Sequence, residues 1–93
     1  MIHSFADRQT ESVWARRHVR GLGPDLQRMA HRKLLILDAA ETLGDCNAPP
    51  GNRLESLGGD RQGQHSIRIN DQYRICFVWT PSGPSDVEIV DYH

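Results

Sequence analysis

The spacing of apolar residues changes half-way along the chain, from the period of a helix to that of a strand. From Pro24 to Leu43 apolar residues recur every three or four positions, which predicts an amphipathic helix that begins at the proline and stops at Gly44. The residues that form this stripe are Leu26, Met29, Ala30, Leu34, Leu37 and Ala40. After Gly51 apolar and polar residues alternate, which is typical of β-strands. Helices therefore precede the sheet along the chain.

Shorter signals complete the predicted architecture. Ile2–Phe5 is an edge-strand candidate, and Asp7 is placed to cap a first helix that runs to Arg17. Four alternating segments follow Gly51, separated by turn residues, and they centre on Leu54, Ile67 and Ile69, Tyr73 to Trp79, and Val87 and Ile89. The sequence thus predicts an α+β fold over residues 1–93: one domain, in which a short N-terminal strand and two helices pack on a twisted antiparallel sheet of about four strands.

The central hairpin is the most informative segment. A three-residue loop, Asn70–Gln72, keeps the apolar side chains of both strands on one face, whereas a two-residue loop mixes apolar positions with charged ones. The longer loop places Arg68 directly opposite Arg74. Like charges in opposed positions destabilise a sheet by up to about 1 kcal/mol, so the pair either forms an anion site or is neutralised by carboxylates such as Glu88 or Asp86. Spacing alone leaves both interpretations open.

The distribution of charge along the chain is more informative than the net charge. The 93 residues include 11 Lys+Arg and 12 Asp+Glu, a net charge of −1, which excludes a uniformly basic surface. Yet residues 16–33 carry six cations against the single acid Asp25, and only Lys33 of the whole set of cations is lysine. Because the arginine fork binds phosphate or carboxylate bidentately, a polyanionic partner fits this chain.

Hydropathy and the spacing of cysteine and other ligand residues indicate the cellular location and the cofactors to expect. No stretch approaches the ~20 apolar residues of a membrane span, and the N-terminus lacks the apolar region of a signal peptide, so we expect a cytoplasmic protein without membrane contact. Cys46 and Cys76 match neither a disulfide framework nor a redox motif, which predicts two free thiols. No His, Cys or acidic residues show ligand spacing, so neither a metal nor another cofactor is expected.

The last three residues, Asp91, Tyr92 and His93, form the second candidate constellation. Imidazole titrates near pH 6.5 and suits proton transfer, while Asp91 is placed to orient the ring and Tyr92 to stack on a base or donate a proton. The alternative is a frayed and solvated chain end. Four arginines of the C-terminal half are candidates to hold phosphates: Arg53, Arg61, Arg68 and Arg74.

Three segments together resemble the HigB branch of the RelE-type bacterial toxins. They are GNRLE at 51–55, the stretch from GDR at 59–61 to SIRINDQYRICF at 66–77, and VEIVDYH at 87–93, in this order. The resemblance implies a microbial-ribonuclease-like α+β fold and a toxin that cleaves mRNA in the ribosomal A site. It also implies neutralisation by a HigA-like helix-turn-helix antitoxin, which represses the operon that the two proteins share.

The resemblance also suggests roles for the candidate residues. Metal-free RNA cleavage needs a base, an acid and cations around the developing phosphorane. Arg68 and Arg74 would supply the charge, and His93 the proton transfer, with Asp91 and Tyr92 in support. Some relatives carry a His or Lys where this chain has ESLG at 55–58, which leaves the general base open, with Glu55 as a candidate.

A non-catalytic module that binds nucleic acid or protein is the alternative function. In that case residues 16–33 would form the docking surface, and Arg16, Arg17 and Arg20 would matter more than Arg74 and His93. In a toxin, the same basic stretch has three interpretations: contact with ribosomal RNA, contact with an acidic antitoxin surface, or the solvated side of two helices.

Overall fold

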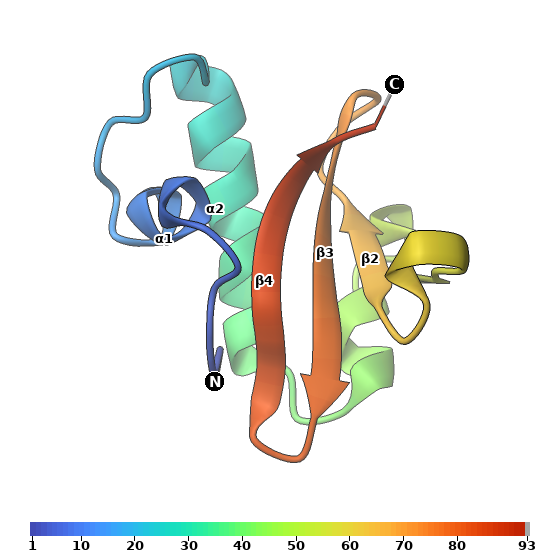
Figure 1. Ribbon diagram of the computed structural model, residues 1–93. Coiled ribbons are helices and arrows are strands. Elements are labelled where there is room, and N and C mark those ends of the chain that lie inside the picture. Colours follow the sequence, from blue (N-terminus) through green and yellow to red (C-terminus); the bar gives the residue numbers. More distant parts are fainter. Residues whose placement is uncertain (93) are drawn as a thin grey trace.

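The computed structural model describes residues 1–92 and shows two helices on one face of a four-stranded antiparallel sheet (Figure 1). This arrangement confirms the predicted α+β class. The helices are α1 (Arg8–Trp14) and α2 (Pro24–Ala39). The strands lie in the order of the chain, namely β1 (Glu55–Ser56), β2 (His65–Arg68), β3 (Tyr73–Thr80) and β4 (Gly83–Asp91). Three 3-10 turns join them: η1 (Leu43–Asn47), η2 (Pro50–Asn52) and η3 (Gly59–Arg61).

The core lies between α2 and the sheet. The helix buries Ala30, Leu34 and Leu37, which belong to the predicted apolar stripe. The strands bury alternate side chains against them, among them Ile67, Ile75, Phe77, Val87 and Ile89. Helical burial at every third or fourth position, and alternate strand side chains that face α2, follow the predicted pattern. The other face of the sheet carries mainly polar side chains, and Ser66 and Cys76 on that face are also fully buried.

The first helix begins as predicted and ends early. The Asp7 carboxylate accepts a hydrogen bond from the Thr10 amide at 2.7 Å, so the N-cap is confirmed. The helix ends at Trp14, three residues before the predicted end at Arg17, because Arg16 adopts a left-handed conformation with φ of 61°. Arg16 and Arg17 therefore lie in the connection between the two helices.

The second helix also ends early, at Ala39 instead of Leu43. Ala40 is extended, with ψ of 132°, and the chain then starts the new turn η1. Thr42 and Asp45 form a reciprocal capping box at the start of that turn, in which each side chain accepts a hydrogen bond from the other residue's amide. A local cap that competes with helix continuation explains the difference.

The N-terminal segment does not form the predicted strand, but it lies at the edge of the sheet, as predicted. Residues 2–5 form only an isolated parallel bridge, between Phe5 and Val87 of β4. The His3 amide donates to the Pro84 carbonyl at 2.8 Å, so the segment still lies along the outer edge of β4. Too few ladder hydrogen bonds form for a continuous strand.

The predicted hairpin register is confirmed. Ile67 lies opposite Ile75, and Arg68 lies opposite Arg74. The Asn70 side chain accepts hydrogen bonds from the Gln72 and Tyr73 amides, both at 2.8 Å, which fixes the turn. The cross-strand arginine pair follows directly from this register.

Candidate active site

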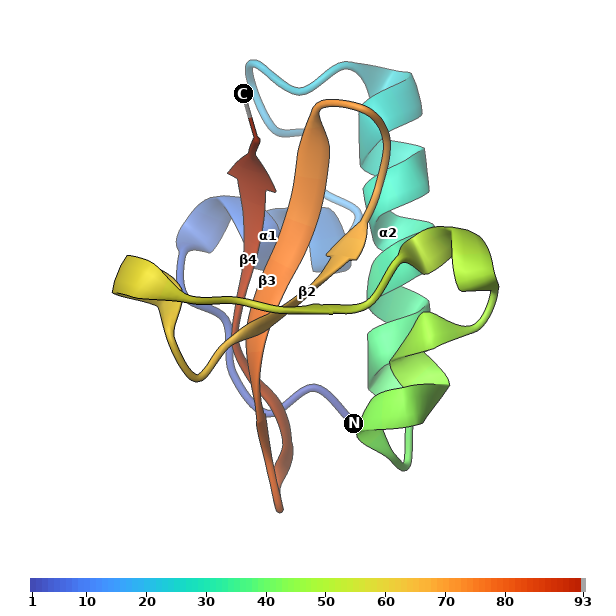
Figure 2. The ribbon, with the colours of Figure 1, turned by 90° about the vertical axis from the view of Figure 1, so that its right-hand side faces the viewer.

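A cleft of about 360 Å³ lies on the polar side of the sheet, near the end of β4. Figure 2 shows the yellow-green segment between η2 and η3 crossing in front of β2 and β3, on the side away from the helices. Because strand side chains alternate, Arg74 points to this side while its neighbour Ile75 is buried in the core. The residues that line the cleft are Arg53, Glu55, Arg68, Asn70, Asp71, Arg74 and Tyr92.

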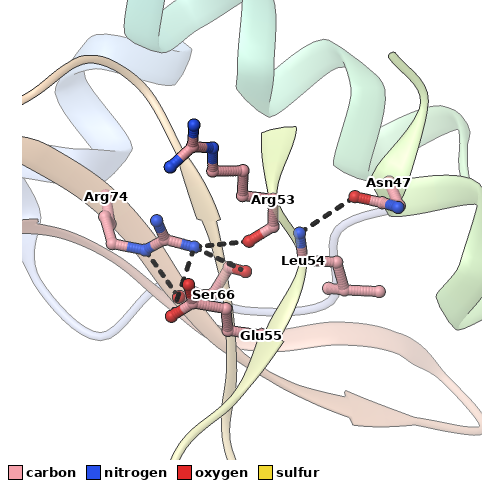
Figure 3. Close-up of polar contacts among 6 residues, drawn as sticks. All are labelled: Asn47, Arg53, Leu54, Glu55, Ser66 and Arg74. Carbon is pink, nitrogen blue, oxygen red and sulfur yellow. Dashed lines mark hydrogen bonds and ion pairs between the residues drawn. The ribbon is translucent and has the colours of Figure 1, made fainter. Parts of the chain in front are cut away.

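Arg74 is held rigidly at the centre of this site (Figure 3). Its Nε donates to Ser66 Oγ at 2.8 Å, and its Nη2 donates to the Arg53 carbonyl at 2.6 Å. Glu55 Oε2 lies 3.8 Å from the same Nη2, and the Arg74 side chain is only 11% exposed. The two N–H groups of Nη1 take no part in these bonds. Arg74 therefore joins β3 to β2 and to the crossing segment, and it keeps one edge of the guanidinium for a ligand.

Arg68 is the more accessible member of the arginine pair. It forms an ion pair with Asp71, whose side chain is fully exposed. An exposed ion pair of this kind contributes about 0–1 kcal/mol, so an anion entering the cleft displaces Asp71 at little cost. Neither arginine of the pair contacts Glu88 or Asp86, the carboxylates that the sequence suggested. Instead, Arg68 pairs with Asp71, and Arg74 lies close to Glu55.

Arg53 reaches the cleft because of an unusual backbone conformation. It ends η2 in the left-handed region, with φ of 48° and ψ of 60°, and its side chain is exposed. The neighbouring amide, of Leu54, donates to Asn47 Oδ1 at 2.9 Å (Figure 3). Together with the Arg74 bond to its carbonyl, this contact fixes the direction in which the chain leaves Arg53.

Two residues that support this loop were not recognised from the sequence. Asn52 is fully buried, and its amide nitrogen donates to the Cys46 carbonyl at 3.0 Å, while its oxygen accepts a hydrogen bond from the Lys33 ammonium. Burial and the positive charges of Arg68 and Arg32 lower the pKa of Lys33. An asparagine beside Pro-Pro-Gly looks like an ordinary turn residue, so no sequence signal distinguished Asn52. Lys33 adds a further cation close to Arg68.

Tyr92 lies at the cleft with its hydroxyl protonated at neutral pH. Its amide donates to the Gln72 carbonyl at 2.6 Å, which ties the end of the chain to the β2–β3 turn. Partial burial and the neighbouring Cys76 thiol raise the pKa of Tyr92, while Arg61 and Arg74 oppose this effect. The phenol therefore keeps its proton at neutral pH, and its role in the site stays a prediction.

The remaining candidate residues lie elsewhere. Asp91 is opposite Tyr73 on the side of the sheet that faces the helices, where it accepts a hydrogen bond from Gln72 Nε2 at 3.2 Å. Arg61 does not line the cleft. It pairs with Glu88 at 3.1 Å, close enough to Tyr92 for its charge to oppose the rise in the pKa of that phenol. His93 lies outside the described residues. The basic residues before α2 are also remote from the cleft: Arg16, Arg17 and Arg20.

Comparison with known proteins places this chain in a family. The model of the HigB-like toxins, described as RelE-like toxins of the type II toxin–antitoxin system HigB, matches residues 3–93. The chain belongs to this family. As a HigB-like toxin of a type II system, it has an antitoxin as its partner. The resemblance carried by the three sequence segments is thereby confirmed.

Two individual relatives are similar to this chain, and one of them is named as a HigB toxin. Toxin HigB-1 of Vibrio cholerae serotype O1 is 42% identical over 81 residues, which cover 85% of this chain and 84% of that protein. An uncharacterized protein of Haemophilus influenzae is 38% identical over 55 residues, or 59% of this chain and 54% of the relative. Within residues 1–92, neither helix of this HigB-like toxin has the length and apolar character needed to span a bilayer.

Proposed function

We propose that this HigB-like toxin is a ribosome-dependent endoribonuclease, which cleaves mRNA in the A site and so inhibits translation in the cytoplasm. The cationic cleft carries the proposal. Arg53, Arg68 and Arg74 come from three separate segments and line one hollow with Tyr92. Guanidinium groups bind phosphate oxygens through paired N–H donors, and a tyrosine ring offers a stacking surface for a base.

In the proposed reaction the 2′-oxygen of the nucleotide attacks the adjacent phosphorus, and the bond to the 5′-oxygen breaks. A base removes the 2′-hydroxyl proton, an acid protonates the leaving 5′-oxygen, and the phosphorane between them carries extra negative charge. Arg68, Arg53 and the Nη1 edge of Arg74 would stabilise that charge. Because Arg74 is already fixed by Ser66 and the Arg53 carbonyl, it needs little reorganisation when the charge develops.

Three residues are the proposed proton-transfer groups: Glu55, Tyr92 and His93. Glu55 is the carboxylate candidate for the base, since it lines the cleft within 3.8 Å of Arg74. We propose His93 as the second proton-transfer group, and the protonated Tyr92 hydroxyl as a donor to the phosphate or the leaving oxygen. We also propose that Asp91, two residues before His93 in the chain, orients that imidazole.

The partners proposed for this activity are the ribosome, its mRNA and a HigA-like helix-turn-helix antitoxin that represses the shared operon. The cleft is small, at about 360 Å³, and it offers few base-reading groups. An enzyme of this kind depends on the ribosome to present the mRNA backbone in a reactive geometry. This dependence distinguishes the proposal from a general ribonuclease.

Cleavage of mRNA on programmed ribosomes by purified protein tests the proposal, with Arg68→Ala as the decisive variant. Removing a cation from a developing charge costs about 10²–10³ in rate. The substitution loses only an exposed ion pair, so the fold is retained. Arg8→Ala, an exposed cation of α1, is the matched control and should cleave normally. Tyr92→Phe and removal of His93 should each reduce the rate.

Two outcomes contradict different parts of this proposal. If the unmodified chain neither cleaves mRNA on ribosomes nor arrests growth when induced, the endoribonuclease assignment is wrong and a non-catalytic binding module takes its place. If the chain cleaves mRNA and the Arg68→Ala variant cleaves it equally fast, the activity stands but the cleft is not its site.

A further inference from the structure

A second hollow lies on the helical side of the molecule, and it is larger than the cleft. It has a volume of about 540 Å³ and lies between α1, the connection that follows it, and α2. The cations that line it include Arg16, Arg28 and Arg32, and an apolar wall is formed by Val13, Pro24 and Leu35. We call this hollow the helical pocket. It shares no lining residue with the cleft.

The walls of the helical pocket are held in place by specific contacts. The Gln27 side chain accepts a hydrogen bond from the Val19 amide at 2.8 Å and donates to the Arg17 carbonyl at 3.0 Å, which ties the connection to α2. The His31 ring stacks on Trp14 with a centroid distance of 5.6 Å. A pocket that exists before its ligand arrives loses little conformational entropy on binding.

The hydrogen bonds of His31 define its protonation state. Arg16 Nε donates to His31 Nε2 at 3.2 Å, and since a guanidinium only donates, Nε2 must be an acceptor. The proton of the neutral ring is then on Nδ1, which lies 3.3 Å from the Val13 carbonyl. Arg16 is thus oriented by a neutral histidine, and its charge is not compensated by that contact.

The charge of the pocket selects an acidic ligand. Within residues 1–92, Arg16 and Arg32 form no ion pair, and Arg28 pairs only with the exposed Asp25. Carboxylates that approach the pocket would meet arginines whose forks are unoccupied or easily released. Phosphates of an RNA would satisfy the same charges, so charge alone does not decide the class of partner.

The apolar wall decides it. Leu35 is 45% exposed and lines the helical pocket beside Pro24, so an aliphatic side chain lies among the arginines. An RNA backbone offers no aliphatic surface to cover Leu35, whereas a protein segment carries carboxylates and apolar side chains together. The combination of arginines, Leu35 and a preformed hollow fits an acidic amphipathic segment of a protein.

We propose that the helical pocket is the docking site of the antitoxin, which binds through an acidic segment with an apolar side chain seated against Leu35. Carboxylates of that segment pair with Arg16, Arg28 and Arg32. The proposal rests on membership of a type II toxin family and not on ribonuclease activity. Because the pocket and the cleft share no residue, binding to the antitoxin and catalysis are separable by substitution.

The test measures affinity for the purified cognate antitoxin by calorimetry, in the absence of ribosomes. The Arg28→Glu/Arg32→Glu double variant should lose at least 100-fold in affinity, and Leu35→Asp at least 10-fold. Arg8→Glu makes the same charge reversal as each of these arginine substitutions at an exposed position outside the pocket, and it should stay within about threefold of the unmodified chain. Thermal unfolding of each variant confirms that it is folded, and Arg32→Gln offers a milder substitution.

Growth assays provide the second measurement. A toxin with the Arg28→Glu/Arg32→Glu substitutions should arrest growth even when the antitoxin is co-expressed, whereas the control variant should be neutralised. Equal affinity of the pocket variant and the unmodified chain overturns the proposal, as does an equal loss in the control variant. If the pocket variant loses salt-sensitive binding to ribosomes while it keeps the antitoxin, the pocket is an RNA site and the proposal fails. Absence of mRNA cleavage by the unmodified chain refutes only the proposed function, because antitoxin affinity is measured separately.

Discussion

Asn52 offers the sharpest test of how the cleft is built. Its side chain is fully buried and joins three parts of the molecule, since it donates to the Cys46 carbonyl in η1, accepts from Lys33 in α2, and stands next to Arg53 in the cleft. Replacing it with alanine removes these two hydrogen bonds at once, together with a longer one from its amide nitrogen to the Ala48 carbonyl at 3.4 Å. The Cys46 carbonyl and the Lys33 ammonium are then left without this partner in a partly buried setting.

The expected cost of Asn52→Ala is about 3 kcal/mol. A neutral hydrogen bond contributes about 1 kcal/mol and one to a charged group about 1.5–3 kcal/mol, and unsatisfied buried groups keep the cost near the upper end. Small domains have unfolding free energies of about 5–15 kcal/mol, so this is a large fraction of the total. At about 4–8 °C per kcal/mol, the midpoint of thermal unfolding should fall by about 12–24 °C.

Urea unfolding followed by circular dichroism provides the assay, with Asn47→Ala as the matched control. Asn47 is the same residue type in the same region, but it makes one exposed hydrogen bond, to the Leu54 amide. Its replacement should cost about 1 kcal/mol or less. A double-mutant cycle with Lys33→Met should show a coupling of about 1–2 kcal/mol between Lys33 and Asn52. Equal small losses for Asn52→Ala and Asn47→Ala would refute the argument that Asn52 holds the loop.

Two further predictions concern other positions. Gly83 has φ of +112°, and a Cβ there would lie 2.2 Å from the Met1 carbonyl oxygen, whereas Gly63 has φ of +91° with open space around it. Gly83→Ala should therefore lower the unfolding free energy by about 2 kcal/mol more than Gly63→Ala does. Equal losses in urea unfolding would contradict this prediction. Burial raises the pKa of the Cys46 thiol to about 11 and also raises that of Cys76, so neither should react with a thiol-specific disulfide reagent at pH 8 until the protein is unfolded. Rapid labelling of either cysteine in the folded protein would show that its side of the core opens.

Several features of the fold could be predicted because they depend on neighbours in the sequence. The register of β2 and β3 follows from the alternation of apolar residues and the length of the Asn70–Gln72 turn, and it places Arg68 opposite Arg74. The Asp7 cap depends on a residue three positions away. The helix ends were missed where a competing local conformation intervened, as at Thr42, whose cap begins a new turn.

The sequence predicted which types of residue form the candidate site better than it predicted which individual residues line the cleft. Arg53, Arg68, Arg74 and Tyr92 were all singled out, and they do line one cleft. Arg61 has the same chemistry but pairs with Glu88, a residue far away in the sequence. A sequence pattern does not show which carboxylate a given arginine will contact in the folded protein. It therefore could not distinguish Arg61 from the arginines that line the cleft.

The sequence by itself determined the class of fold, the face on which the paired arginines lie and, through three segments that resemble the HigB-like toxins, the family. Those properties depend on periodicity and short-range geometry. Only the tertiary structure decided how Arg74 is held by hydrogen bonds, with the Nη1 edge of its guanidinium available to a ligand. It also decided that Lys33 and Asn52 support the loop that ends at Arg53, and that Asp91 faces away from the cleft. These facts depend on how α2, η2 and β4 pack, because side chains far apart in the chain meet only when the core is formed.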